Sequence, residues 1–258
     1  MSDITIVCCY NNEKIYNDFV YSLKTQTCNY ELIGIDNTSN KNFSSCASAY
    51  NSVLNQIRTK YVIFSHQDIL LNKPDSLAKF LGYLNKIGQH DILGVAGVKF
   101  DEECTYSEIK HINPHDGKLI QAGENITSGI MQCDTLDECF FGGYSEHFKA
   151  NPFDEKICKW HLYAVDSCLN AKSQNANIWV CSLNITHVSR GMADLKFYFG
   201  FYRICRKYKN FFPFIRTTIS YSNTNFKDSF RLLAHVIIAE PLKRLGIFEY
   251  VRKILRKS

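Results

Sequence analysis

The 258-residue chain lacks the sequence features of several protein classes. Its first residues show no basic stretch followed by an apolar one, so we expect no secretory signal. No window holds about 18 uncharged apolar residues, so we expect no membrane-spanning helix. Neither an internal repeat nor a low-complexity stretch occurs. With 45% hydrophobic and 14% aromatic residues, the chain has enough apolar material for a folded core rather than a disordered chain.

The cysteines also lack a pattern that would mark a disulfide scaffold or a structural zinc site. The chain has 11 of them, an odd number, and no two are spaced as C-x2-C. Together with the expected absence of an export signal, this predicts reduced thiols in a cytosolic protein. Cys8 and Cys9 lie in an apolar segment, where packing in the core is the expected role.

The net charge of +5 is unevenly distributed along the chain. Residues 1–191 carry 16 basic and 21 acidic side chains, a net of −5, whereas residues 192–258 carry 14 basic and 4 acidic side chains, a net of +10. We therefore expect two parts, 1–191 and 192–258, that face different partners.

Residues 3–100 show apolar runs of strand character that alternate with stretches of helical character. The expected strands cover residues 3–10, 30–36, 60–65 and 91–100, and the expected helices cover 13–24, 44–57 and 76–87. This alternation predicts an α/β fold with a doubly wound, mainly parallel sheet. After a hairpin-rich insertion at 101–129, we expect a further helix at 160–173, with one strand before it and one after it.

Polar residues directly follow the first three expected strands. They are Tyr10 and Asn12, Asp36 and Asn37, and His66 and Asp68. One polar strand end would show only that a strand had stopped. Because the carboxyl ends of parallel strands meet at one edge of such a sheet, where ligands bind, three polar ends predict a single site.

The ordered motifs of residues 3–191 resemble those of family 2 glycosyltransferases with the GT-A fold, a Rossmann-like fold. The motifs are, in order, ITIVCCYNNE, IGIDNTS, AYNSVLNQIRTKYVIFSHQDILL, CDTLDECFF, FDEKICKWHLYAVDSCLNA and ITHVSRG. The resemblance implies transfer of a sugar from a nucleotide diphosphate to an acceptor hydroxyl. It also implies inversion at the anomeric carbon and the use of Mg²⁺ or Mn²⁺.

In enzymes of this fold the third strand usually ends in Asp-x-Asp, which positions the metal against the diphosphate. Here the residues are His66, Gln67 and Asp68, so the resemblance implies that Asp68 binds the metal; the alternative is a carboxylate that caps the next turn. His66 is expected to bind the donor or to pack, rather than to bind the metal. His187 matches a second family position, and its imidazole suits Mn²⁺ better than Mg²⁺. Its alternative is a loop histidine bonded to backbone.

The resemblance also implies a donor site across the first two strand ends. The backbone around Cys8 and the ring of Tyr10 would flank the base, and Asp36 would accept a hydrogen bond from a ring N–H of uracil or thymine. A UDP or dTDP donor fits this arrangement, although Asp36 could instead form an Asx turn. Further candidates for donor binding are Asn12, Asn51, Gln67 and Arg190, of which Asn51 and Arg190 could equally be ordinary surface residues.

The proton acceptor of the reaction is the least defined part of the expected site. Many relatives carry an Asp at the start of the late helix, where this chain has Ala164, which cannot accept a proton. The remaining candidates are Asp137, Glu138, Asp166 and His161. For Asp166 the alternative is a carboxylate that orients the helix, and for His161 a ring packed beside Trp160.

Residues 192–258 interleave aromatic residues with Lys and Arg, and then continue as amphipathic pieces divided near Pro241 and Gly246. This pattern predicts a basic, amphipathic helical appendage that lies on an anionic membrane surface. Each Lys or Arg near such a surface contributes on the order of 1 kcal/mol. The alternative is an appendage that packs on the catalytic domain or on a partner chain. Nucleic-acid binding is not expected, because no recognition motif accompanies the charge.

Together these features predict a cytoplasmic glycosyltransferase, peripheral on the inner face of the cell membrane. Its acceptor would be a glycan or a lipid-linked glycan, and family habit suggests a bacterial surface polysaccharide such as lipopolysaccharide or capsule. A nucleotidyltransferase that makes the activated sugar is a second hypothesis. It should carry a Gly-rich basic loop after the first strand, which CCYNNEK is not. A non-catalytic nucleotide-sugar or glycan-binding module is a third, favoured by Ala164 and His66.

Overall fold

The computed structural model describes residues 2–112, 117–189 and 193–244, and for residues 239–244 it describes the backbone only. The chain forms two compact units. The first comprises residues 1–191 and 216–220, and the second comprises residues 192–215 and 221–258. The end of the predicted basic appendage, residues 245–258, lies outside the described residues.

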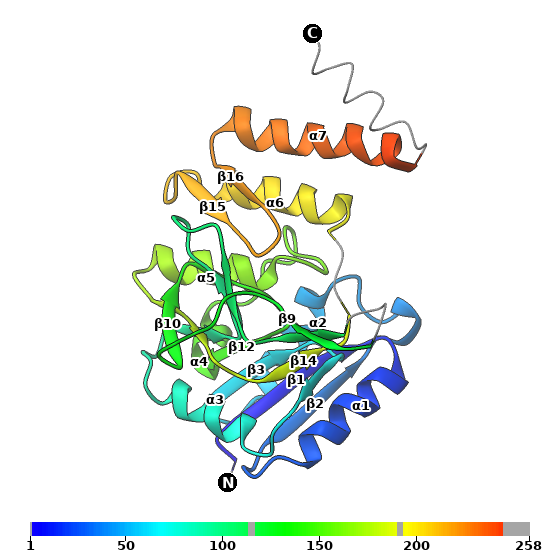
Figure 1. The fold of residues 1–258 in the computed structure, drawn as a ribbon, viewed down its shortest axis with the longest axis vertical. Helices are drawn as coiled ribbons and strands as arrows, with labels where there is room; N and C mark the ends of the chain where they lie inside the picture. The colour runs from blue at the N-terminus through cyan, green and yellow to red at the C-terminus, as the bar shows by residue number, and fades with distance from the viewer. Residues whose placement is uncertain (1, 113–116, 190–192, 245–258) are drawn as a thin grey trace. The chain divides into compact units, whose positions relative to one another are not determined.

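A central seven-stranded sheet forms the first unit, with the strand order β10-β13-β5-β12-β3-β1-β2 (Figure 1). Its strands are β1 (Ile4–Tyr10), β2 (Glu31–Asp36), β3 (Tyr61–Ser65), β5 (Ile92–Gly94), β10 (Ile130–Cys133), β12 (Phe140–Tyr144) and β13 (Ile178–Cys181). β1 pairs in parallel with β2 and β3, but β12 runs antiparallel to β3 and β5, and β10 antiparallel to β13. The predicted α/β class is confirmed, while the sheet is mixed rather than mainly parallel.

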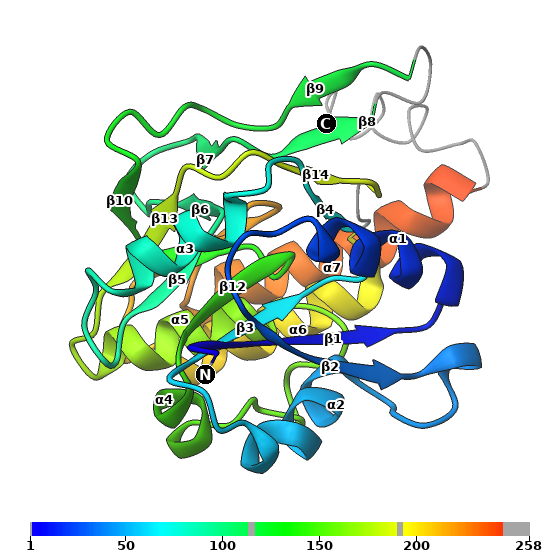
Figure 2. The same ribbon diagram turned by 90° about the horizontal axis from the view of Figure 1, so that it is seen from below.

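Five α-helices accompany the sheet in the described part of this unit. They are α1 (Glu13–Lys24), α2 (Cys46–Val53), α3 (Ser76–Leu84), α4 (Ser145–Ala150) and α5 (Tyr163–Ser173), with short 3-10 turns at Thr38–Asn40 and Leu54–Gln56. α1 and α2 lie on opposite faces of the β1–β2–β3 region (Figure 2). Ile4, Ile6 and Val7 of β1 are fully buried because both faces of this strand are covered, as the unbroken apolar run predicted.

Two smaller sheets extend the first unit. One has the order β4-β14-β8-β9, built from β4 (Ile69–Leu71), β14 (Ile185–His187), β8 (Lys110–Ile112) and β9 (Leu119–Gln121). The other contains β11 (Thr135–Leu136), β6 (Ala96–Val98) and β7 (Thr105–Ser107). The strand predicted at 91–100 is therefore two strands, β5 and β6, because the chain leaves the central sheet at Val95 and joins another one.

The second unit combines two helices with a short hairpin. Its elements are α6 (Leu195–Lys207), β15 (Phe214–Arg216), β16 (Tyr221–Asn223) and α7 (Phe226–Arg244). α6 and α7 lie side by side, and β15 pairs with β16 (Figure 1). No helix of the described part of the chain combines the length and the apolarity needed to cross a bilayer.

Candidate active site

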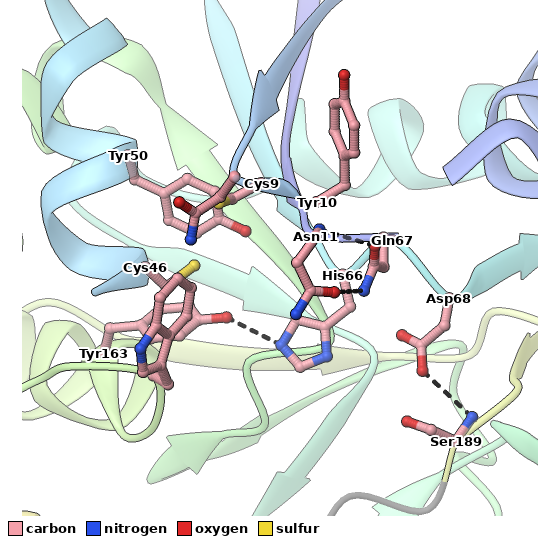
Figure 3. A pocket seen from close by; sticks show the side chains of 12 residues that line it. Cys9, Tyr10, Asn11, Cys46, Tyr50, His66, Gln67, Asp68, Tyr163 and Ser189 are labelled. Atoms are coloured by element: carbon pink, nitrogen blue, oxygen red, sulfur yellow. Dashed lines mark hydrogen bonds between the residues drawn. The ribbon is translucent and has the colours of Figure 1, made fainter. Parts of the chain in front are cut away.

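A cavity of about 220 Å³ lies at the carboxyl ends of β1 and β3 (Figure 3). Its lining residues are Cys9, Tyr10, Asn11, Asn37, Cys46, Tyr50, His66, Gln67, Asp68, Trp160, Tyr163 and Ser189. The structure thus brings together residues that follow all three of the strands predicted to end in one site. The sequence analysis did not predict Cys9, Cys46, Tyr50 or Tyr163 as site residues, because apolar and aromatic residues within strands and helices are usually expected to pack in the core.

Three potential metal ligands meet beside this cavity. The ligand atoms of His66, Asp68 and His187 all lie within 4.8 Å of one another. Antiparallel pairing of β4 with β14 places His187 opposite Ile69, the residue after Asp68. One carboxylate and two imidazoles form a donor set that suits Mn²⁺ and other first-row divalent ions.

The buried geometry of Asp68 and His187 supports a cation there. The Asp68 Oδ1 and His187 Nε2 atoms are 3.3 Å apart, while the other Asp68 oxygen accepts the backbone N–H of Ser189 at 3.2 Å. The His187 Nε2 atom is buried and makes no well-aligned hydrogen bond, even to the facing carboxylate. An imidazole nitrogen in that state lacks a partner that a metal ion would provide, so the residues present fit the implied Mn²⁺ or Mg²⁺.

The protonation states of this cluster follow from burial and mutual charge. Burial, with the nearby His187, lowers the pKa of His66 to about 4, so its ring is neutral at pH 7. Burial acts to raise the pKa of Asp68, but the imidazoles of His187 and His66 outweigh it and hold that pKa below its usual range. Burial acts to lower the pKa of His187, and Asp68 overcomes this to raise it. A neutral imidazole and an ionised carboxylate are the forms that ligate metals, and His66 and Asp68 are in those forms, whereas a metal would have to displace the proton that Asp68 favours on His187.

Further side chains hold these ligands in place. The His66 Nε2 atom lies 2.9 Å from the Tyr163 hydroxyl (Figure 3), and the Nδ1 atom of His111 lies 3.1 Å from the His187 carbonyl. His111 belongs to β8, in the insertion that the sequence analysis left without a role. Such second partners orient ligand rings, so Tyr163 and His111 are supporting residues of the cluster.

Gln67 links the third strand to the loop after the first. Its Oε1 atom accepts the backbone N–H groups of Asn11 and Asn12 at 3.1 and 3.0 Å, and its Nε2 atom donates to the Asn11 side chain at 2.8 Å (Figure 3). Gln67 therefore fixes one wall of the cavity that it lines. The predicted donor contact of Gln67 stays a prediction.

The residues predicted to bind the nucleotide base of the donor differ in how well their positions fit that role. Tyr10 lines the cavity and its ring stacks on Tyr16, with centroids 4.0 Å apart and an interplanar angle of 8°. Asp36 is exposed and accepts the Thr38 N–H at 2.7 Å, the Asx turn that was its alternative. The Thr38 hydroxyl, together with this backbone N–H, lowers the pKa of Asp36. The Cys8 side chain is fully buried, so only its neighbour Cys9 reaches the cavity.

Three other predicted donor residues lie elsewhere or are otherwise engaged. Asn12 caps α1 by accepting the Ile15 N–H at 3.2 Å. Asn51 exchanges two hydrogen bonds of 2.9 Å with the backbone of Phe153 and is not among the residues that line the cavity. Arg190 lies outside the described residues.

The four candidate proton acceptors differ in their surroundings. Asp137 accepts the Cys139 N–H and the Thr218 hydroxyl, each at 3.0 Å. Asp166 is 5% exposed in the first turn of α5, and Ala164 beside it is fully buried. The Asp137 carboxylate thus joins two segments of the chain, and the Asp166 side chain is largely buried; both stay predicted candidates for the proton acceptor.

Glu138 and His161 instead form a pair in front of α5. Both carboxylate oxygens of Glu138 accept the Leu162 N–H at 3.2 Å, and the His161 Nδ1 atom lies 3.8 Å from one of them. Leu162 has a φ of 69°, a left-handed conformation that a bulky residue rarely adopts. Burial, with the nearby Asp137, raises the pKa of Glu138 to about 8. His161 is the more open of the two, with 31% of its side chain exposed.

Comparison with known proteins identifies the family. A model described as "Glycosyltransferase like family" matches residues 5–198. The chain belongs to this glycosyltransferase-like family. The expected enzyme class, a family 2-like glycosyltransferase, is thereby confirmed.

A curated protein from Fuscovulum blasticum, named "ATP synthase subunits region ORF 6", is 25% identical over 188 residues, which cover 71% of this chain and 73% of that protein. Its name says nothing of an activity.

Solved glycosyltransferase structures confirm the GT-A fold. GalNAc-T7, crystallised with UDP, GalNAc and Mn²⁺, aligns with a TM-score of 0.56 at 11% identity, covering 82% of this chain and 51% of that one. S. aureus TarS aligns at 0.54 and 16% identity, covering 81% and 39%. Its fragment 1–349 with UDP-GlcNAc aligns at 0.52 and 18% identity, covering 80% and 66%. The chain thus spans between about two fifths and two thirds of the length of these proteins.

Proposed function

We propose that the chain transfers a sugar from a UDP- or dTDP-sugar to a hydroxyl of a glycan or lipid-linked acceptor, with inversion and with help from a divalent ion. One observation carries the proposal. His66 and Asp68, which belong to the three-residue ligand cluster, also line the cavity that Cys9 and Tyr10 share at the carboxyl end of β1. A metal-held diphosphate and its nucleoside would therefore occupy adjoining places. GalNAc-T7 and TarS, which share the fold, were crystallised with UDP and with UDP-GlcNAc, respectively.

Asp68, His187 and His66 would hold the ion, which when bound offsets the negative charge that develops on the leaving diphosphate. The remaining task of the protein is to place the acceptor hydroxyl and to take its proton. As the hydroxyl oxygen forms a bond to the anomeric carbon, the bond to the diphosphate breaks, and the electron pair leaves with the nucleotide. The hydroxyl proton needs an acceptor close by.

His161, steadied by Glu138, is the proton acceptor that the geometry favours. It adjoins Trp160, which lines the cavity, and it is more open than Glu138. A carboxylic acid with a pKa of about 8 next to an imidazole gives a pair that can exchange one proton near neutral pH. Asp137 and Asp166 remain the alternatives, with the hydroxyl of Thr218 already bonded to Asp137.

The finer setting of this activity rests on the family resemblance. We propose that residues 1–191 carry the transfer reaction, that residues 192–258 associate with an anionic membrane surface, and that the product belongs to a surface polysaccharide made on the cytoplasmic face of the membrane. The unequal charge of the two parts of the chain supports this division.

The decisive test is the substitution Asp68→Ala, with Asp75→Ala as control. Both carboxylates precede an ordered element, but Asp75 is exposed, makes no capping bond and lies outside the cavity. We expect wild type and Asp75→Ala to bind UDP in a Mn²⁺-dependent way in calorimetry and to hydrolyse or transfer a donor sugar. Asp68→Ala should lose both while remaining folded by circular dichroism, although the loss of its contacts with His187 and Ser189 should lower its melting temperature. Undiminished turnover by Asp68→Ala would remove the metal assignment.

The same assay addresses the non-catalytic alternative, which Ala164 favours. Binding of UDP by the wild type without turnover of any nucleotide sugar, with or without acceptors, would identify a binding module rather than a transferase.

A further inference from the structure

The second unit contains a surface depression whose lining residues do not belong to the candidate active site. It has a volume of about 680 Å³ and lies between the end of α6, the hairpin strand β16 and the beginning of α7. Its lining residues are Arg206, Lys209, Asn210, Pro213, Asn223, Thr224, Asn225 and Phe226. The described lining residues include two cations and three amides but no carboxylate. Because Asn223 and Asn225 each donate to Asp228, the groups of the lining that would meet an anion are the cations Arg206 and Lys209.

The guanidinium of Arg206 is held in position at this depression. Its Nη1 atom donates to the Thr224 carbonyl at 2.9 Å, and its central carbon lies 5.7 Å from the centroid of the Phe226 ring. A fixed planar fork loses less side-chain entropy when it meets a phosphate than a mobile one does. The nearest acidic group is already engaged, because Asp228 accepts the amides of Asn225 and Asn223 at 2.8 and 2.9 Å.

An exposed apolar stripe of α7 begins at the same depression. Phe226, Phe230 and Ile237 are 58%, 49% and 41% exposed. At about 100° per residue they lie within roughly 40° of one another around the helix. The rings of Phe226 and Phe230 stack, with centroids 5.5 Å apart and an interplanar angle of 8°. Phe226 therefore belongs both to the polar depression and to the apolar stripe.

A ligand that satisfies both features needs an anionic head and an apolar body. We infer that this depression binds the phosphate of an anionic phospholipid headgroup through Arg206 and Lys209, while the stripe Phe226–Phe230–Ile237 lies in the interfacial layer of the bilayer. Amphipathic helices with basic flanks and exposed Phe occupy that layer. Charge complementarity selects the partner, because residues 192–258 carry a net charge of +10. This binding requires no nucleotide sugar, so it stands or falls apart from the transfer reaction.

Co-sedimentation of the full-length chain with vesicles tests the site. We expect binding to vesicles of phosphatidylcholine mixed with phosphatidylglycerol and little binding to phosphatidylcholine alone. Lys209→Ala should lower the partition coefficient roughly 5-fold, because a lysine held at an anionic surface contributes about 1 kcal/mol to the free energy of binding. Lys196→Ala is the matched control: this lysine is exposed on α6 but does not line the depression. Equal losses for both lysines would indicate diffuse attraction and overturn the site.

Two further experiments test the apolar stripe and the source of the phosphate separately. Phe226→Ala should weaken vesicle binding at least as much as Lys209→Ala, whereas Tyr21→Ala, which removes a 73% exposed ring from the first unit, should not. In buffer without divalent ions, inorganic diphosphate should compete weakly and should raise the melting temperature of the wild type no more than that of Lys209→Ala. If vesicles do not bind and diphosphate stabilises the wild type more than Lys209→Ala, the depression takes a soluble phosphate and the inference is wrong. Lys209 makes no packing contact in the core, so its variant keeps the test valid should Phe226→Ala unfold.

Discussion

At the scale of single residues, the site depends on where charge is buried. Asp68 stays ionised under burial because two imidazoles face it, whereas Glu138 has only a backbone N–H and a weakly placed imidazole, and a second carboxylate stands beside it. The pKa of Asp68 is therefore lowered, whereas the pKa of Glu138 is raised. This opposition fits the proposed roles, in which Asp68 binds a cation and the Glu138–His161 pair exchanges a proton.

Substitution at His161 tests the proton-transfer assignment. We expect His161→Ala to lower kcat about 100-fold or more while the Kd for UDP stays within about 2-fold, because general-base catalysis contributes 10²–10⁴-fold. Glu138→Gln, which keeps an oxygen for the Leu162 N–H, should lower kcat less and should flatten its pH dependence below about pH 8. Stopped assays of transfer over a pH series give both values. An unchanged kcat in His161→Ala would return the role to Asp137 or Asp166.

The raised pKa of Glu138 also predicts how stability depends on pH. The folded chain holds this proton up to about pH 8, whereas the unfolded chain releases it near the ordinary value of 4.5. The free energy of unfolding therefore falls as the pH rises from about 4.5 to about 8, because the folded chain holds a proton that the unfolded chain has released. Urea unfolding at pH 5 and pH 8 should show a larger loss of stability for wild type than for Glu138→Gln. Parallel losses in the two proteins would contradict the buried, protonated state.

At the scale of elements, the sequence predicts β1, β2, β3 and the helices between them because each is a continuous apolar or amphipathic run with polar ends. It does not predict β12, whose short run Phe140–Tyr144 enters the sheet between β3 and β5 in the antiparallel direction. Direction and partner of a short buried strand depend on tertiary pairing, which periodicity does not encode. The departure of β6 at Val95 was missed for the same reason.

The same limit applies to the site. That Tyr10, His66 and Asp68 lie at one edge could be predicted because strand ends are visible in the sequence. Their roles, and that of His187, whose motif resembles a family position, stay predictions. The supporting roles of Tyr163 and His111 depend on contacts from distant segments, so no local pattern indicates them. Asn51 shows the converse. This polar helix residue was predicted to contact the donor, and in the structure its side chain donates a hydrogen bond to the backbone of Phe153.

Asn51→Ala distinguishes those two roles. Its side chain satisfies both the N–H and the carbonyl of Phe153, whose ring is packed against those of Tyr50 and Phe64. Loss of these bonds should lower the free energy of unfolding by about 1–3 kcal/mol, because the buried backbone groups would be left unpaired. The Kd for UDP should not change. A stable variant with weakened UDP binding would restore Asn51 to the donor site.

At the scale of the whole molecule, the charge boundary at residue 191 and the compact units do not coincide fully. The chain returns from the second unit to give residues 216–220 to the first. There the Thr218 hydroxyl donates to Asp137, and the Arg216 carbonyl accepts the Thr135 hydroxyl at 2.6 Å. The predicted division at 191/192 stays a prediction, and a truncation at that point would remove groups that belong to the first unit.

Thr218→Val measures what this returning segment contributes. Removing the hydroxyl leaves Asp137 with the Cys139 N–H as its remaining described hydrogen bond, so its carboxyl group loses a partner at a part-buried position. A hydrogen bond to a charged group contributes about 1.5–3 kcal/mol, so the melting temperature should fall by several degrees. Thr25→Val, which removes an exposed hydroxyl bond at the end of α1, should have little effect. If the two variants had the same melting temperature, residues 216–220 would make no measurable contribution to the stability of the first unit. A larger drop in Thr218→Val would show that the first unit is completed by chain from beyond the charge boundary.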